Sequence, residues 1–121
     1  MFLSARLIGV PVQVRKEDSQ LKPEVATQIV DKLIEKDKVP IITGVTFSNV
    51  FMAVHKKVTD QEVFIISSNA GPAPIAGAQC SPYSYVTSWQ NDMQSEGVGK
   101  YATDKGFKRV VIMAPNYQSG K

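Results

Sequence analysis

Hydrophobic positions along the chain follow two patterns in turn, one typical of amphipathic helices and one typical of short strands. Apolar residues recur at spacings of three and four over residues 23–36 and again from about 48 to 58, which predicts two helices with an apolar stripe. A third helical pattern runs from about 91 to 105 and ends at Gly106. The β-rich runs between these helices predict strands at 10–15, 39–43, 63–66, 83–87 and 109–113.

Strands and helices that alternate at this spacing are typical of the α/β class with right-handed crossovers. We therefore expect a doubly wound, mostly parallel sheet with helices on both faces. The last apolar run, 109–113, is continuous, which favours a strand covered on both faces. Only residues 1–9 precede the first clear strand, and 116–120 resembles a loop that leads into a further helix. We therefore expect this chain to be part of a larger one.

Composition places the chain among single globular domains and disfavours two classes of partner. It has 121 residues, of which 43% are hydrophobic and 21% charged. The net charge is +3, but acidic residues stand among the lysines and arginines, so we expect solvated helical faces and no nucleic-acid partner. No apolar run approaches the roughly 18 residues of a membrane span. Residues 1–10 are too short and too interrupted for a secretory signal.

Candidate catalytic and metal-binding groups are few. No glycine-rich phosphate loop is present, and Pro72 and Pro74 remove backbone donors from the one glycine-flanked loop. The only histidine, His55, lies in the middle of a predicted helix, and the only cysteine, Cys80, has no second cysteine to pair with. We expect no metal, no cofactor and no catalysis. A flavodoxin-like or hydrolase-type α/β enzyme is the alternative, and it would need a nucleophile or phosphate loop at a strand end.

Small hydrogen-bonding residues follow three of the predicted strands, over 44–48, 67–71 and 116–117. In an open α/β sheet these strand ends form one rim, where ligands bind. Ser48 stands where a helix N-cap is expected, and the N-terminus of a helix favours a carboxylate. The alternative is that Ser48 is only a cap and Tyr117 only a loop aromatic. The candidate ligand-binding residues are Phe47, Ser48, Asn69, Ala70, Gly71 and Tyr117.

Five segments together resemble a known family. They are KPEVATQ (22–28), TGVTFSNVFMAVHKKVTD (43–60), SSNAGPAPIAGAQCSP (67–82), TSWQND (87–92) and VVIMAPNYQSGK (110–121). In this order and spacing they resemble the N-terminal lobe of a type I periplasmic binding protein, in the leucine/isoleucine/valine-binding branch that serves ABC importers. Members that take aromatic or amino-acid carboxylates are the most similar. The resemblance covers residues 10–121, and residues 1–9 lie outside it.

The resemblance implies a periplasmic protein with two lobes that close on a small carboxylate without catalysis, delivering it to an ABC permease in the full-length protein. It implies that Ser48 holds the ligand carboxylate, that main-chain groups of residues 69–71 contact the same end, and that Tyr117 covers the ligand. Gly71 stands where some amino-acid binders carry a hydroxyl. This difference favours a ligand without an amino group.

The resemblance also indicates missing parts. The family's first strand and helix, its hinge and its second lobe have no counterpart here, so we interpret residues 1–121 as a single truncated lobe. Loss of a central strand would leave an open sheet edge that invites pairing with another copy. We therefore expect a homo-oligomer. A remnant lobe that folds and self-associates without binding ligand is a further alternative.

Overall fold

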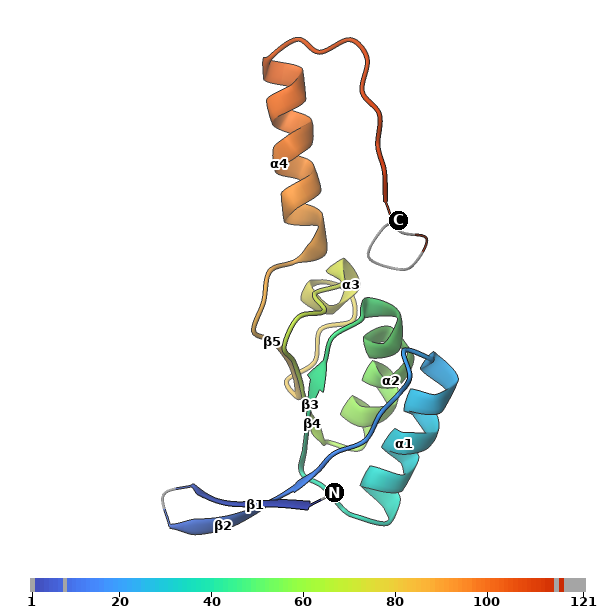
Figure 1. Cartoon of the computed structure of the whole chain (residues 1–121), viewed down its shortest axis with the longest axis vertical. Coiled ribbons are helices and arrows are strands. Elements are labelled where there is room, and N and C mark those ends of the chain that lie inside the picture. The colour runs from blue at the N-terminus through green and yellow to red at the C-terminus, as the bar shows by residue number, and fades with distance from the viewer. Residues whose placement is uncertain (1, 8, 115, 117–121) are drawn as a thin grey trace.

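The computed structural model describes residues 2–7, 9–114 and 116, and the chain has an α/β fold with a parallel sheet flanked by helices, as predicted (Figure 1). The elements in chain order are β1 (Phe2–Leu7), β2 (Val10–Arg15), α1 (Pro23–Glu35), β3 (Ile41–Val45), α2 (Ser48–Asp60), β4 (Phe64–Ser67), α3 (Ala73–Ala76), β5 (Ser84–Val86) and α4 (Asn91–Asp104). The short helix α3 and the strand β1 are elements that the sequence pattern did not predict.

The strands form two separate sheets. In the first, β3, β4 and β5 are parallel and lie in that order, with Ile42 opposite Ile65 and Ile66 opposite Tyr85. In the second, β1 and β2 form an antiparallel hairpin in which Leu7 pairs with Val10. Over the residues that the structure describes, β2 therefore pairs only with β1 and is not hydrogen-bonded to the parallel sheet.

The helix α1 follows from local sequence signals. Pro23 occupies its first turn, where the missing N–H costs nothing, and Glu24 is favourable beside the positive end of the helix dipole. Its apolar stripe buries Ala26, Val30 and Leu33. This face packs against α2, and Figure 1 shows the two helices side by side on one side of the sheet.

The core lies between α1, α2 and the inner face of β4. Phe51, Val54 and Val58 of α2 and Ile65 of β4 are between 0% and 1% exposed. Their spacing on α2 is the three-and-four pattern of the sequence, so the predicted apolar stripe is the one that is buried.

The prediction of a covered strand at 109–113 is wrong in this structure. None of the described residues pairs with this run, and Val111, Ile112 and Met113 are 90%, 86% and 94% exposed. A β-rich run forms a strand only where a neighbouring strand supplies hydrogen bonds, and the parallel sheet ends at β5. The helix α4, whose predicted bounds are confirmed, buries none of its residues and projects from the upper end of the molecule (Figure 1).

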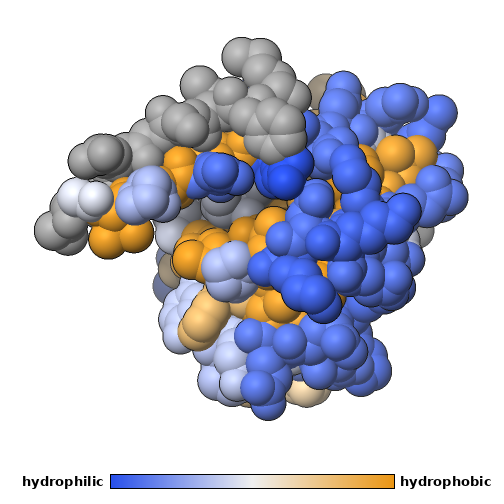
Figure 2. Space-filling view, turned by 90° about the horizontal axis from the view of Figure 1, so that it is seen from below, coloured by the Kyte–Doolittle hydropathy of each residue, from blue (hydrophilic) through white to orange (hydrophobic). Residues whose placement is uncertain are grey.

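A large apolar groove separates β2 from β3. Its volume is about 730 Å³, and it is lined by residues of β2, the loop after it, α1, β3 and the start of α2. The view from the lower end of the molecule shows hydrophobic surface in the middle of that end, beside a broad hydrophilic flank (Figure 2).

Candidate functional site

The carboxyl ends of β3 and β4 meet at one edge of the parallel sheet. The ladder between them shifts register between Thr43 and Val45, where Gly44 adopts a φ of +88° that other residues rarely tolerate. Beyond this shift Val45 pairs with Ser67, the last residue of β4. The loops that follow β3 and β4 therefore begin side by side, as expected if these strand ends form one rim.

Ser67 holds these strand ends together. Its side chain is fully buried, and its Oγ lies 2.6 Å from the carbonyl oxygen of Ala70 and 3.1 Å from that of Val45. The carbonyl oxygen of Ser67 accepts hydrogen bonds from the backbone N–H and the hydroxyl of Thr87, at 3.0 and 3.1 Å. Ser67 lies on the rim predicted from the sequence, and its role in joining three strand ends was not predicted.

Ser48 occupies a different helical position from the one predicted. The helix begins at Ser48, and Phe47 is the N-cap residue, because the carbonyl oxygen of Phe47 accepts the first helical hydrogen bond from the N–H of Phe51 at 2.9 Å. No side chain caps the helix. Ser48 is 2% exposed, and its Oγ accepts a hydrogen bond from Nδ2 of Asn91 at 2.9 Å.

Asn91, the first residue of α4, joins two parts of the site. Besides its bond to Ser48, its backbone N–H donates to the carbonyl oxygen of Gly71 at 2.9 Å. Glycine is the only residue type that fits at position 71, because a Cβ on Gly71 would lie 2.0 Å from the carbonyl oxygen of Trp89. Asn91 is not among the site residues predicted from the sequence. The sequence feature that pointed to Asn91 was its position at the start of a predicted helix.

The remaining predicted site residues lie on the same edge where the structure describes them. Asn69 is exposed, and its Nδ2 donates to the carbonyl oxygen of Thr46 at 3.1 Å, while Ala70 is buried. Phe47 is half-buried and packs against the core. Tyr117 lies outside the described residues. The structure thus brings five of the six predicted residues together, at the ends of β3 and β4.

A small cavity opens beside this edge. Its volume is about 340 Å³, and of the five predicted site residues that the structure describes, only Gly71 lines it. The other lining residues come from α3, β5 and the segment before α4, and they are Pro72, Ile75, Ala76, Ser84, Tyr85, Val86, Ser88 and Gln90.

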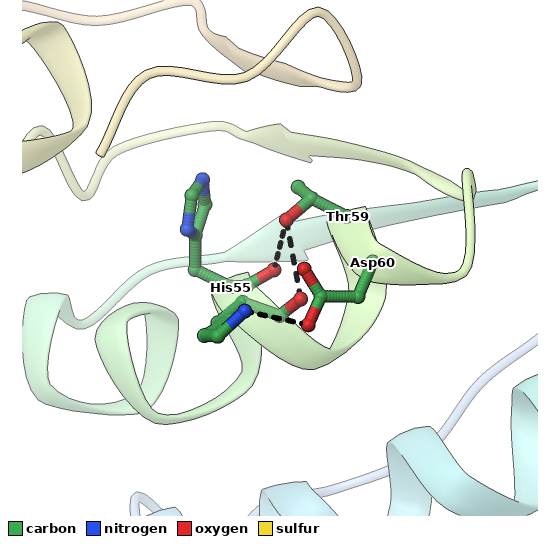
Figure 3. A network of polar contacts seen from close by, with 4 residues as sticks. His55, Thr59 and Asp60 are labelled. Atoms are coloured by element: carbon green, nitrogen blue, oxygen red, sulfur yellow. Dashed lines mark hydrogen bonds and ion pairs between the residues drawn. The ribbon is translucent and has the colours of Figure 1, made fainter. Parts of the chain in front are cut away.

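His55 lies in the core, away from this edge. The residue is 4% exposed, its ring packs edge-on against Phe51 at a centroid distance of 5.6 Å, and its Nε2 has no hydrogen-bond partner among the described residues. Figure 3 shows the imidazole pointing away from Asp60, whose carboxylate pairs with Lys56, while the hydroxyl of Thr59 donates to the backbone carbonyl of His55. Burial lowers the pKa of His55, and the charge of Asp60 opposes this shift. These contacts favour a structural role.

We expect the free energy of unfolding to fall as the pH drops below about 6.5, the ordinary pKa of histidine. Below that value the unfolded chain binds a proton at His55 that the folded chain, with its lowered pKa, does not bind, so acid favours unfolding until the folded pKa is passed. Urea unfolding at pH 5.5 and 7.5 measures this difference. In His55→Leu the difference in the free energy of unfolding between pH 5.5 and pH 7.5 should shrink. An unchanged difference would assign the pH dependence to other groups.

Metal and membrane signals are lacking in the part of the chain that the structure describes. No group of three or more His, Cys, Asp or Glu side chains gathers there in a way that could hold a metal ion. None of the described helices combines the length and the apolar character that crossing a membrane requires. Cys80 is exposed and has a free thiol.

The fold and this edge define a class of protein. A parallel α/β sheet with small hydrogen-bonding residues gathered beyond its strand ends is the architecture in which open sheets hold small ligands. A family model described as periplasmic binding protein matches residues 5–121. The chain belongs to this periplasmic binding protein family.

Solved structures agree with this assignment. An ABC transporter substrate-binding protein from Sphaerobacter thermophilus is 35% identical, with a TM-score of 0.76 over 93% of this chain and 31% of that one. A solute-binding protein of an ABC transporter from R. palustris, in complex with benzoate, is 30% identical, with a TM-score of 0.79 over 87% of this chain and 29% of that one. A solute-binding protein from Rhodopseudomonas palustris BisB5, in complex with 3,4-dihydroxybenzoic acid, is 27% identical, with a TM-score of 0.82 over 95% of this chain and 31% of that one.

The chain thus spans less than a third of the length of these solved structures. The comparison with curated proteins gave no match.

Proposed function

We propose that this chain is one lobe of the solute-binding protein of an ABC importer, and that it binds a small carboxylate without catalysis. One observation carries the proposal: Asn91 is hydrogen-bonded both to Ser48, at the start of α2, and to Gly71, in the loop after β4. In the full-length protein the partner would be an ABC permease and the location the periplasm. Residues 1–121 would form a single truncated lobe of that protein.

Hydrogen-bond direction supports a role for Ser48 in holding a carboxylate. Asn91 donates to the Ser48 hydroxyl oxygen, so the hydroxyl hydrogen of Ser48 is not used in that bond and can be donated to an anion. The N-terminus of α2 adds a favourable dipole at the same place. Because Ser48 is 2% exposed, a ligand oxygen reaches this hydroxyl only when the groups that cover it move.

The chemical class of the ligand is proposed from the relatives. Two solved relatives, at 30% and 27% identity, are complexes with benzoate and 3,4-dihydroxybenzoic acid. Both ligands carry a carboxylate on an aromatic ring and no amino group. Gly71 has no side chain with which to bind an ammonium group. We therefore place aromatic carboxylates ahead of amino acids, with Phe47, Asn69 and Ala70 as further contacts and Tyr117 as the aromatic cover.

Calorimetric titration with benzoate, 4-hydroxycinnamate, phenylalanine and leucine tests this proposal. We expect benzoate or 4-hydroxycinnamate to bind, and Ser48→Ala to weaken that binding by about 1–3 kcal/mol because a charge-assisted hydrogen bond is lost. The matched control is Ser95→Ala on the exposed face of α4, which should leave the affinity unchanged.

Two outcomes would contradict the proposal. Dissociation constants weaker than about 1 mM for all four compounds, a binding free energy under about 4 kcal/mol, would favour a remnant lobe that folds without binding ligand. Binding that Ser48→Ala does not alter would move the site to another part of the molecule. The homo-oligomer expected from the sequence is a separate proposal, tested by sedimentation of the chain over a range of concentrations.

A further inference from the structure

Asn91 contacts the site through both its backbone and its side chain. Its backbone N–H donates to the carbonyl oxygen of Gly71 at 2.9 Å, which holds the start of α4 against the loop after β4. Its Nδ2 donates to the Oγ of Ser48, 43 positions earlier in the chain, also at 2.9 Å. The side-chain contact is partly buried, so water competes for it less than at an exposed position. Two hydrogen bonds to different loops therefore fix where the Asn91 amide lies.

The direction of the side-chain hydrogen bond determines what Ser48 can offer a ligand. A serine hydroxyl has one hydrogen to donate and two lone pairs with which to accept. The amide nitrogen of Asn91 only donates, so it occupies a lone pair of Ser48 and leaves the hydroxyl hydrogen for another acceptor. An ionised aspartate at position 91 would only accept, and it would draw that hydrogen toward itself.

The segments that meet at this contact are almost without ionisable groups. They are the start of α2 with the residues before it, the end of β4 with the loop after it, and the segment that enters α4, at 46–54, 67–76 and 87–93. Their one ionisable side chain is Asp92, which is exposed and accepts a hydrogen bond from Gln90 at 3.4 Å. His55 lies roughly 10 Å from Ser48 along the axis of α2. Neutral donors would thus hold a carboxylate here, and its affinity depends on how each donor is oriented.

We propose that Asn91 is a positioning residue of the binding site, which orients the Ser48 hydroxyl so that its hydrogen is directed to the ligand carboxylate. The inference rests on the proposed function and adds that position 91 requires an amide and excludes a carboxylate. Asn91 acts through Ser48 and does not itself contact the ligand. The requirement concerns hydrogen-bond direction, because aspartate has nearly the shape of asparagine and keeps the backbone hydrogen bond to Gly71.

Calorimetric titration of Asn91→Asp tests the inference, with benzoate as the ligand, or 4-hydroxycinnamate if the wild type binds it more tightly. At pH 7.5 the new carboxylate accepts the Ser48 hydrogen and repels the ligand, so we expect binding about tenfold weaker or more. The matched control is Gln94→Glu, the same amide-to-acid change on the exposed surface of α4, which should bind as the wild type does. Asn91→Asp should remain folded, since an acid in the first turn of a helix is favourable.

The pH dependence of binding is a measurement that a merely structural role would not change. Protonated aspartic acid carries an O–H that can donate to Ser48 in place of the amide. A nearby anion favours this protonated form, so ligand binding to Asn91→Asp takes up protons. From pH 7.5 to pH 5.0 we expect the loss of affinity relative to the wild type to shrink by about threefold or more. The wild type, titrated at the same pH values, controls for His55, Asp92 and the ligand itself.

Two alanine variants show whether Asn91 acts through Ser48. Asn91→Ala leaves the Ser48 hydroxyl free to turn, so we expect it to bind the same ligand about three- to tenfold more weakly. In the Ser48→Ala background, Asn91→Ala should have little further effect, because no hydroxyl is left to orient.

The results that would overturn the inference differ from those that would overturn the proposed function. Wild-type affinity of Asn91→Asp at pH 7.5 would mean that Ser48 does not depend on an amide at position 91. An equal loss from Asn91→Ala with and without the Ser48 hydroxyl would mean that Asn91 contacts the ligand or supports the fold. In both cases the wild type binds, and the proposed function stands. No binding of either compound by the wild type would refute the proposed function and this inference together.

Discussion

Replacement of Phe51 by alanine is expected to lower the free energy of unfolding by about 3–5 kcal/mol, the usual cost of truncating a buried phenylalanine. The Phe51 side chain is 0% exposed and lies in the core cluster that joins α1, α2 and β4. A domain of this size is stable by roughly 5–15 kcal/mol, so the variant should lose a large part of its stability. Urea unfolding followed by circular dichroism measures the difference.

Phe107→Ala is the matched control for this experiment. Phe107 is 58% exposed and contacts Tyr101 edge-on at a centroid distance of 6.3 Å, so its truncation should cost no more than about 0.5 kcal/mol. Equal losses in the two variants would mean that the packing of α2 against β4 is not the main source of stability.

A second large loss of stability is expected when Gly71 is replaced by alanine. An alanine Cβ there would lie 2.0 Å from the carbonyl oxygen of Trp89 and 3.0 Å from its carbonyl carbon, both of which are backbone atoms. Relief of this clash requires the segment before α4 to move, which breaks the hydrogen bonds of Asn91 to Gly71 and to Ser48. Overpacking costs about 1–3 kcal/mol and each lost hydrogen bond about 1, so Gly71→Ala should lose about 3–5 kcal/mol in total.

Gly97→Ala provides a control of opposite sign. Gly97 lies within α4, and a Cβ there would meet nothing within 4 Å. Alanine favours the helix over glycine by about 0.5–1 kcal/mol, so this variant should be slightly more stable than the wild type. If Gly71→Ala were as stable as Gly97→Ala, the close approach of Trp89 to Gly71 would be absent in solution.

The site could be predicted in part because parallel strands bring their carboxyl ends to one edge. That rule was enough to gather Phe47, Ser48 and the loop of Asn69, Ala70 and Gly71 from the sequence. It could not identify Asn91, whose role depends on where α4 starts in space. The rule also could not predict that Phe47 takes the N-cap position. A shift of one residue along the chain changes which carbonyl oxygen accepts the first helical hydrogen bond.

The sequence by itself determined the class of fold and the three long helices α1, α2 and α4. The apolar stripes of α1 and α2, the stop at Gly106 and the bounds of α4 follow from local spacing, because a helix satisfies its own backbone hydrogen bonds. Strands depend on partners, and only the tertiary structure decided those. It paired β1 with β2 in a separate hairpin and left residues 109–113 exposed. It also formed an apolar groove between β2 and β3, which do not pair with each other among the described residues, since the hydrogen bonds of a strand come from residues far away in the sequence.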